Sequence, residues 1–192
     1  MTQDFTDIYY AFVDKLEVEK YFDSLPKIRA EKAKKLKVLE KQQCSVGVYL
    51  LLCKALEKYG INAKNYELKY DKYGKPYLID CPLYFSLAHS GNCVAVAISN
   101  KPVGVDVEVI KDFDYNVRQY VFTEKDEKDF QNTIDKVDCF YEKWTKKEAQ
   151  YKLDLRAFKG DYDDPFYNFK IKEKYMFAVA PNKPTKIEEI TI

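Results

Sequence analysis

The sequence predicts an α+β fold made of two similar halves that pack against each other. The main observation is that an order of strand, helices and strands occurs twice along the chain, with the join near residues 98–103. In addition, several strand-like segments are joined by short connections containing Gly, Asn or Pro, which are typical of antiparallel hairpins. We therefore expect an N-terminal half at residues 1–100 and a C-terminal half at residues 101–192, and not a doubly wound parallel sheet.

The first half begins with a strand at residues 8–13, where apolar side chains alternate between two faces. Residues 27–41 are predicted to form one basic helix, because they hold seven basic residues against two acidic ones. An apolar helix is expected over residues 45–59, and Gly60 is a typical helix-ending residue.

Strand-forming residues then recur at short intervals. The predicted strands cover residues 66–70, 77–79, 84–87, 93–99 and 103–107. The segment His89–Asn92 is expected to be a loop joining two of these strands, and Asn100–Pro102 is expected to close a second hairpin.

The second half is predicted to be helical and acidic at first. Residues 106–135 contain nine acidic and four basic residues. A long helix is expected over residues 136–155, followed by aromatic-rich strands near 166–172 and 175–180.

Composition excludes several classes of protein. Apolar residues make up 46% of the 192 residues, which is ample for a packed core and argues against a disordered chain. A net charge of +1 argues against a generic basic nucleic-acid binder. The longest purely apolar run, Val48–Cys53, is too short to span a membrane, and the N-terminus does not resemble a signal peptide. Five cysteines without a CxxC pair, with a single histidine, favour reduced thiols in the cytoplasm over a zinc site.

Two carboxylates are predicted to lie on one face of a strand. Asp106 and Glu108 are separated by one residue in the segment Val103–Glu108, and residues i and i+2 of a strand point the same way. Paired oxygen ligands suit a hard cation such as Mg²⁺, but a D-x-E pair is common, and taken alone its default explanation is a solvated strand end.

A third carboxylate, Glu148, falls within an apolar stripe of the long helix. The stripe consists of Val137, Phe140, Trp144, Tyr151 and Leu155. A carboxylate on such a face is costly unless a cation or hydrogen bonds compensate it. Lys152 follows one turn later, so a simple ion pair with Glu148 is one explanation; a metal ligand beside a phosphate-directed lysine is the other.

Basic residues elsewhere suggest an anion site. The loop position expected for His89 would allow it to reach a phosphate, and Lys75 lies in a predicted turn from which it could also reach one. The basic helix with Arg29 and Lys32 is by default a solvated surface, and alternatively a site for a nucleotide phosphate or an acidic partner.

Four motifs together resemble the Sfp-type 4′-phosphopantetheinyl transferases. They are Tyr-Gly-Lys-Pro (73–76), Phe-Ser-Leu-Ala-His-Ser-Gly (85–91), Val-Gly-Val-Asp-Val-Glu (103–108) and Lys-Trp-Thr-Lys-Lys-Glu-Ala-Gln-Tyr-Lys (143–152). The resemblance runs from about Leu25 to Lys172. It implies a pseudo-dimer of two α+β halves, which agrees with the repeated order of elements.

The resemblance implies Mg²⁺-dependent transfer of the phosphopantetheine arm of coenzyme A to a serine of an acyl or peptidyl carrier protein, with release of 3′,5′-ADP. Asp106, Glu108 and Glu148 would hold Mg²⁺, with Mn²⁺ as a substitute. Glu148, directly or through a water, would be the base, and Lys152 would stabilise or protonate the leaving phosphate. The other implied contacts to coenzyme A come from His89, Lys147, Lys75, Arg29 and Lys32.

Three positions depart from the family pattern. Ala88 stands where a serine usually precedes the histidine, and Gln43 or Cys44 stands where a basic residue is frequent. The glycines that often follow the last lysine are replaced by Leu153-Asp154-Leu155.

Other expectations concern partners. The carrier protein would be acidic and steered by a basic rim, with no nucleic-acid or membrane partner, and the enzyme would be a monomer. Two alternatives remain: a non-catalytic phosphate- or nucleic-acid-binding module that uses the basic helix, and a metal-dependent phosphodiester hydrolase that uses the same carboxylates.

Overall fold

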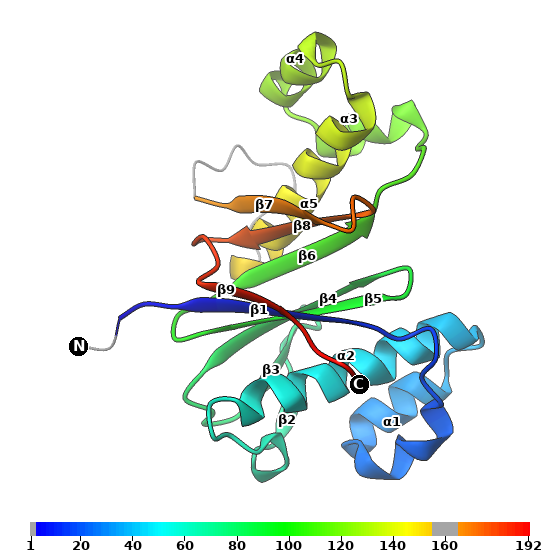
Figure 1. Ribbon diagram of the computed structural model, residues 1–192, viewed down its shortest axis with the longest axis vertical. Helices are drawn as coiled ribbons and strands as arrows, with labels where there is room; N and C mark the ends of the chain where they lie inside the picture. Colours follow the sequence, from blue (N-terminus) through cyan, green and yellow to red (C-terminus); the bar gives the residue numbers. More distant parts are fainter. Residues whose placement is uncertain (1–2, 155–164) are drawn as a thin grey trace.

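The computed structural model describes residues 3–154 and 165–192, which form an α+β fold with two larger sheets stacked face to face (Figure 1). The first sheet has the strand order β4-β5-β1-β9 and the second has the order β6-β8-β7. A separate pair, β2-β3, lies beside the first sheet. In Figure 1 the helices lie outside the two sheets, with α1 and α2 on one side and α3, α4 and α5 on the other.

The elements have the following bounds. The strands are β1 (Thr6–Phe12), β2 (Leu68–Tyr70), β3 (Pro76–Leu78), β4 (Tyr84–Ser90), β5 (Cys93–Ser99), β6 (Gly104–Val109), β7 (Tyr167–Ile171), β8 (Tyr175–Ala180) and β9 (Lys186–Glu189). The helices are α1 (Lys27–Lys34), α2 (Leu39–Glu57), α3 (Arg118–Val121), α4 (Glu124–Asn132) and α5 (Lys136–Asp154). Short 3₁₀ turns occur at Val18–Lys20, Phe22–Ser24, Ala63–Asn65 and Tyr115–Val117.

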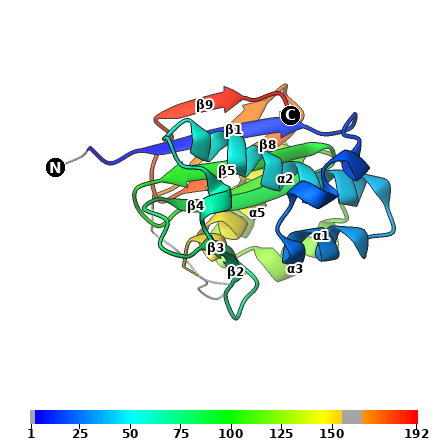
Figure 2. The same ribbon diagram turned by 90° about the horizontal axis from the view of Figure 1, so that it is seen from below.

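The layers follow from the two-residue period of the strands. In β5 every residue is buried, because both faces of this central strand are covered. Val94, Val96 and Ile98 pack in the cluster that contains the apolar face of α2. The alternate residues of β5 pack instead against β6 and β8 of the second sheet, where Val105 and Phe177 are fully buried. The core therefore has one apolar layer under α2 and another between the sheets. Figure 2 shows α2 lying along the first sheet.

The predicted α+β class and most of the elements are confirmed, whereas some boundaries were wrong. The basic segment 27–41 is two helices: α1 ends at Lys34, and α2 begins at Leu39 after Val38, which has an extended backbone. Nε2 of Gln42 donates a hydrogen bond to Leu36 O (2.7 Å), so a carbonyl after α1 is satisfied by a side chain of α2. The break turns α2 so that its apolar residues, including Leu51 and Leu52, lie against the sheet.

The second predicted hairpin was also wrong. The hairpin of β4 and β5 is present, but β6 does not pair with β5; it crosses to the other sheet and pairs antiparallel with β8. The crossover brings β6 into close contact with α5: a Cβ added at Gly104 would lie 1.9 Å from the carbonyl oxygen of Ala149. Only glycine allows β6 to approach α5 so closely.

The end of the chain returns to the first sheet. The strand β9, which the sequence did not reveal, pairs in parallel with β1 through the register Ile8 to Ile187. The last strand thus belongs to the sheet of the N-terminal half, and the division at residue 100 stays a prediction. Among the described residues, no helix combines the length and apolar character needed to cross a membrane.

Candidate active site

The strand β6 and the helix α5 bring the predicted acidic residues together. Asp106 is 4% exposed, and its Oδ1 lies 2.6 Å from Nζ of Lys152. Its Oδ2 is buried and accepts no hydrogen bond from any residue that the structure describes. The close approach of Gly104 to Ala149 sets this arrangement, because it fixes α5 directly over β6.

Glu108 is held by neutral donors from two other elements. Oγ of Ser90 in β4 donates to Oε2 (2.6 Å), and the indole Nε1 of Trp144 in α5 donates to Oε1 (3.3 Å). Ser90 and Trp144 were not predicted to touch the acidic residues. A position of Trp144 near the acidic residues could have been predicted, because it lies one turn before Glu148 on the same helix.

Lys152 does not form the simple helical ion pair that was one explanation of its spacing. Its ammonium contacts Asp106 on the neighbouring strand, and the described ion pairs include none between Lys152 and Glu148. The predicted apolar stripe is confirmed in its first part, because Val137, Phe140 and Trp144 pack in one apolar cluster. Further along the helix the buried face contains Thr145 and Ala149, while Glu148 is only half-buried. One member of that predicted stripe, Leu155, lies outside the described residues.

The acidic residues influence one another electrostatically. Burial raises the pKa of Asp106 to about 7; Lys152 opposes this rise, and the charges of Glu108 and Glu148 add to it. Burial also raises the pKa of Glu148, again against the effect of Lys152. The site therefore has more negative charge than Lys152 alone compensates.

This environment fits a divalent cation by its chemistry. In the described residues, no three His, Cys, Asp or Glu side chains converge into a ready-made metal cluster. Nevertheless, the buried Oδ2 of Asp106 has no hydrogen-bond donor within residues 3–154 and 165–192. In addition, the side chains of Asp106, Glu108 and Glu148 offer carboxylate oxygens whose mutual repulsion a hard cation would relieve.

A basic pocket of about 400 Å³ lies on the side of α1 and α2. Its lining includes Arg29, Lys32 and His89, which were predicted from the sequence, and also Lys41 and Tyr70, which were not. Lys41 belongs to the basic segment 27–41, which was predicted as a solvated surface or an anion site, but Lys41 was not singled out as a contact. The pocket brings cationic side chains from two helices to a histidine of the sheet.

The structure places His89 within β4 and not in the predicted loop. The turn that follows contains Gly91, whose φ of +54° is a left-handed conformation that favours glycine. His89 is an exposed residue of β4, yet partial loss of its solvation lowers its pKa, and the charges of Lys152, Arg29 and Lys32 lower it further. His89 therefore lies within electrostatic reach of both the basic pocket and the acidic site.

Arg29 forms the inner wall of this pocket. Its Nε and Nη2 both donate to the carbonyl oxygen of Ser45, at 3.1 and 2.8 Å, and Nη1 donates to the hydroxyl of Tyr70 (3.1 Å). Lys32 lies outside it, with Nζ 5.1 Å from the ring centroid of Tyr70. Arg29 is thus fixed in place, whereas Lys32 is an exposed cation at the rim.

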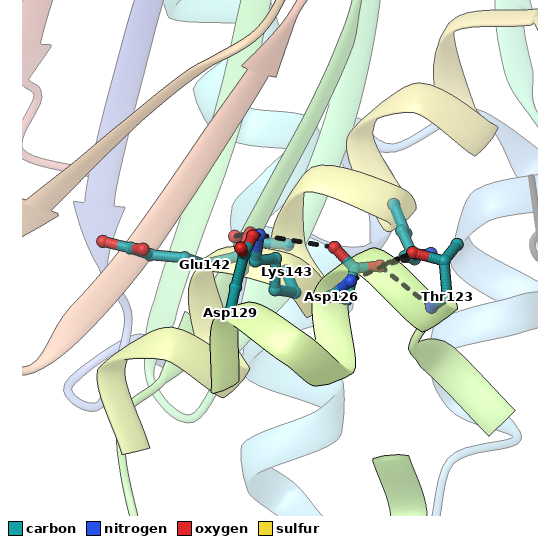
Figure 3. A network of polar contacts seen from close by, with 7 residues as sticks. Thr123, Asp126, Asp129, Glu142 and Lys143 are labelled. Atoms are coloured by element: carbon teal, nitrogen blue, oxygen red, sulfur yellow. Dashed lines mark hydrogen bonds and ion pairs between the residues drawn. The ribbon is translucent and has the colours of Figure 1, made fainter. Parts of the chain in front are cut away.

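The other two predicted phosphate contacts have protein partners. Nζ of Lys75 donates to the carbonyl oxygen of Lys152 at the end of α5, and burial lowers its pKa. Lys147 is 3% exposed, and its Nζ lies 3.1 Å from Asp126 in α4. Figure 3 shows Asp126 with Thr123 and Lys143 in the same polar network. Neither lysine is among the residues that line the basic pocket.

The departures at residues 43, 44 and 88 are also accommodated. Nε2 of Gln43 donates to Asp14 O and Leu16 O, and the thiol of Cys44 donates to Gly91 O. Ala88 is 4% exposed and packs between the sheets. These side chains serve packing and backbone contacts, while Lys41 supplies a cation to the pocket in their neighbourhood.

An acidic site next to a cationic pocket is typical of proteins that bind phosphorylated ligands together with a divalent cation. Residues 102–175, which contain β6 and α5, match the family model of the 4′-phosphopantetheinyl transferase superfamily. The matched range includes Asp106, Glu108, Glu148 and Lys152.

Curated relatives carry the same name. The chain is 32% identical over 151 residues to the 4′-phosphopantetheinyl transferase gsp of Aneurinibacillus migulanus, covering 77% of this chain and 60% of the relative. It is 29% identical over 107 residues to a 4′-phosphopantetheinyl transferase of Bacillus subtilis, covering 54% of this chain and 48% of the relative. It is also 25% identical over 160 residues to the 4′-phosphopantetheinyl transferase Sfp of Bacillus subtilis strain 168, covering 70% of this chain and 71% of that one.

These similarities confirm the resemblance to Sfp-type 4′-phosphopantetheinyl transferases that the four motifs predicted. The chain thus spans only part of the first two relatives: 60% of the length of gsp and 48% of the length of the Bacillus subtilis enzyme to which it is 29% identical.

Proposed function

We propose that this protein is a 4′-phosphopantetheinyl transferase that moves the phosphopantetheine arm of coenzyme A to a serine of an acyl or peptidyl carrier protein. The observation that carries the proposal is that two adjacent residues of β4 reach the two sites: His89 lines the basic pocket, and Ser90 donates to Glu108 of the acidic site at 2.6 Å. The acidic site and the cationic pocket thus meet at this segment of β4, and Lys152, whose Nζ lies 2.6 Å from Asp106, adds a cation to the acidic site. Coenzyme A carries a pyrophosphate and a separate 3′-phosphate, so it presents negative charge at two places.

The division of roles follows from this arrangement. Arg29, Lys32, Lys41 and His89 would bind the nucleotide end of coenzyme A in the basic pocket. Arg29, held by Ser45 and Tyr70, is preorganised, so binding would cost little side-chain entropy there. Lys75 and Lys147 keep the predicted role near phosphates only as a hypothesis, because both ammonium groups contact protein atoms.

The residues Asp106, Glu108 and Glu148 would hold Mg²⁺, or Mn²⁺ in its place. The cation would neutralise the charge of the pyrophosphate and orient it when bound. Glu148 is the candidate base: it would accept the proton of the carrier serine as the serine oxygen forms its bond to the β-phosphorus. The bond from that phosphorus to the 3′,5′-ADP oxygen breaks, and Lys152 stabilises the negative charge on the leaving phosphate.

The strand order supports a pseudo-dimer as part of this proposal. In the first half, β1 is followed by α2, β4 and β5, and β5 lies between β4 and β1. In the second half, β6 is followed by α5, β7 and β8, and β8 lies between β7 and β6. The last strand of each unit is central and antiparallel to both neighbours.

The proposal extends to the setting of the reaction. A monomer in the cytoplasm would meet coenzyme A and acidic carrier proteins there, and all five cysteines are free thiols, in agreement with a reducing compartment. Exposed lysines at the pocket rim, such as Lys32, would attract an acidic carrier.

The test is an intact-mass measurement on an apo carrier protein incubated with coenzyme A, Mg²⁺ and this protein. The carrier is expected to gain the mass of one phosphopantetheine arm, and EDTA should prevent the gain. Consumption of coenzyme A without a change in carrier mass would favour a hydrolase. Neither change, together with salt-sensitive binding of RNA or DNA, would favour the binding-module alternative.

A further inference from the structure

The two larger sheets are joined by serine side chains where β4 and β6 run side by side. Oγ of Ser86 accepts a hydrogen bond from the backbone N–H of Val105 (3.1 Å). Oγ of Ser90 accepts one from the N–H of Val109 (3.1 Å). The spacing is four residues on both strands, so equivalent faces meet twice. We call these two contacts, Ser86–Val105 and Ser90–Val109, the serine seam.

The two serines differ in what their hydroxyl proton does. A serine hydroxyl has one donor and two acceptor positions. Ser90 uses its donor on Oε2 of Glu108 at 2.6 Å, which is a short, charge-assisted bond. The hydrogen bonds of Ser86 in the described residues include no contact with a carboxylate. The pair therefore provides a natural comparison: the same seam contact with and without a link to the acidic site.

Glu108 gains a fixed orientation from this link. Oε1 accepts from the indole of Trp144 (3.3 Å) while Oε2 accepts from Ser90, so donors from α5 and β4 hold the carboxylate from two sides. Both donors are neutral, and they leave the full negative charge of Glu108 available to a cation. Hydrogen bonds of this kind orient a ligating carboxylate and typically change metal affinity by about 10- to 100-fold when removed.

We propose that Ser90 is a positioning residue for Glu108, with Trp144 as its counterpart, and that it couples the placement of the two sheets to the affinity of the acidic site for a divalent cation. This inference rests on the proposed function, because it takes Glu108 to be a ligand. In this proposal Ser90 does not contact the cation; it acts only through Glu108. It follows His89 directly, so one short segment of β4 carries a residue of the basic pocket and a residue that orients the acidic site.

The experiment compares binding of Mn²⁺ alone, measured by electron paramagnetic resonance, in four proteins: the unmodified chain, Ser90→Ala, Ser90→Thr and Ser86→Ala. We expect Ser90→Ala to weaken Mn²⁺ binding by about tenfold. Ser90→Thr keeps a hydroxyl and should stay within about threefold of the unmodified chain. Ser86→Ala should stay within about twofold, although it loses a seam contact of the same kind and should therefore lower the melting temperature.

A fourth variant tests the positioning of Glu108 without changing the serine seam. Trp144→Phe retains an aromatic ring beside Phe140 but removes the N–H that Glu108 accepts, and it should also weaken Mn²⁺ binding. Equal affinities of Ser90→Ala and Ser86→Ala would overturn the proposal, and so would a failure of the unmodified chain to bind Mn²⁺. If the expected order of affinities is found but no carrier is modified, the positioning role stands and the proposed transferase function fails.

Discussion

Lys152 and Asp106 form a partly buried ion pair between α5 and β6, with Nζ 2.6 Å from Oδ1. The pair explains how a lysine one turn after Glu148 is directed away from its helical neighbour and toward the strand. It also places a cation beside Asp106, whose side chain is only 6% exposed, when no metal is bound. A charge in such a position is costly without a partner.

The first prediction concerns this lysine. Lys152→Met keeps most of the apolar stem but removes the ammonium that would stabilise the leaving phosphate. We expect kcat for carrier modification to fall by about 10²-fold, with a smaller change in the KM for coenzyme A, because the interaction strengthens in the transition state. Lys146→Met is the matched control on the same helix, since its ammonium lies 4.3 Å from the ring centroid of Phe166. Equal kinetics for the two variants would remove Lys152 from the mechanism.

The second prediction concerns the candidate base. Glu148→Gln retains the size of the side chain but loses its charge and its ability to accept a proton. We expect kcat to decrease by about 10²-fold or more with an unchanged circular dichroism spectrum. Glu142→Gln, an exposed position on the same helix, should keep near-normal turnover. Near-normal turnover in Glu148→Gln would refute its role as base.

The third prediction concerns the basic pocket. Lys32→Glu reverses a charge at its rim, and we expect the KM for coenzyme A to rise by about tenfold, which corresponds to about 1.4 kcal/mol. Lys34→Glu makes the same change in the same helix, but Lys34 is not among the pocket residues and its Nζ lies over the ring of Phe22. Steady-state kinetics on both variants measure the difference. A comparable rise in KM for both would indicate a general charge effect and not a specific site.

The fourth prediction concerns stability and pH. Burial alone would raise the pKa of Asp126, but hydrogen bonds from Thr123 and the charge of Lys147 lower it to about 2. A carboxyl with a lowered pKa stabilises the folded state above its unfolded pKa of 3.8. Asp126→Asn should therefore reduce the free energy of unfolding by about 2 kcal/mol at pH 7. This difference from the unmodified chain should shrink as the pH falls from about 4 to about 2.

The matched control for this prediction is Asp129→Asn. The Asp129 side chain is 48% exposed and pairs with Lys143, so the loss of its charge should cost well under 1 kcal/mol (Figure 3). Urea denaturation at several pH values measures both variants. A stability difference at Asp126 that does not depend on pH would contradict the assigned ionisation.

The predictable part of the fold followed from local patterns. The alternation in residues 8–13 and the helical spacing of 136–155 identified β1 and α5, because burial imposes these periods on the sequence. The pairing of β6 with β8 could not be predicted, since short connections look alike whether they close a hairpin or cross between sheets. In β9 one residue of four, Glu188, is half-buried, and its single apolar residue, Ile187, is exposed, so the sequence of this strand carries little apolar signal.

The candidate site shows the same division. Asp106 and Glu108 were recognisable from their spacing on a strand, and Glu148 from its place among apolar residues of a helix. The partners of Lys75 and Lys147 were not predictable, because a long lysine side chain can reach carbonyls or carboxylates that lie far away in sequence. For Ser90, the contact with Glu108 depends on how two sheets meet, which no local pattern encodes.

The measurement that tests the central claim most directly quantifies both products of one reaction. Unmodified protein is incubated with coenzyme A, Mg²⁺ and an apo carrier, and the amounts of 3′,5′-ADP and of modified carrier are determined at successive times. Our account predicts that the two rise together in equal amounts, and that Glu148→Gln produces little of either. Release of 3′,5′-ADP without modified carrier, or the absence of both products from the unmodified protein, would contradict it.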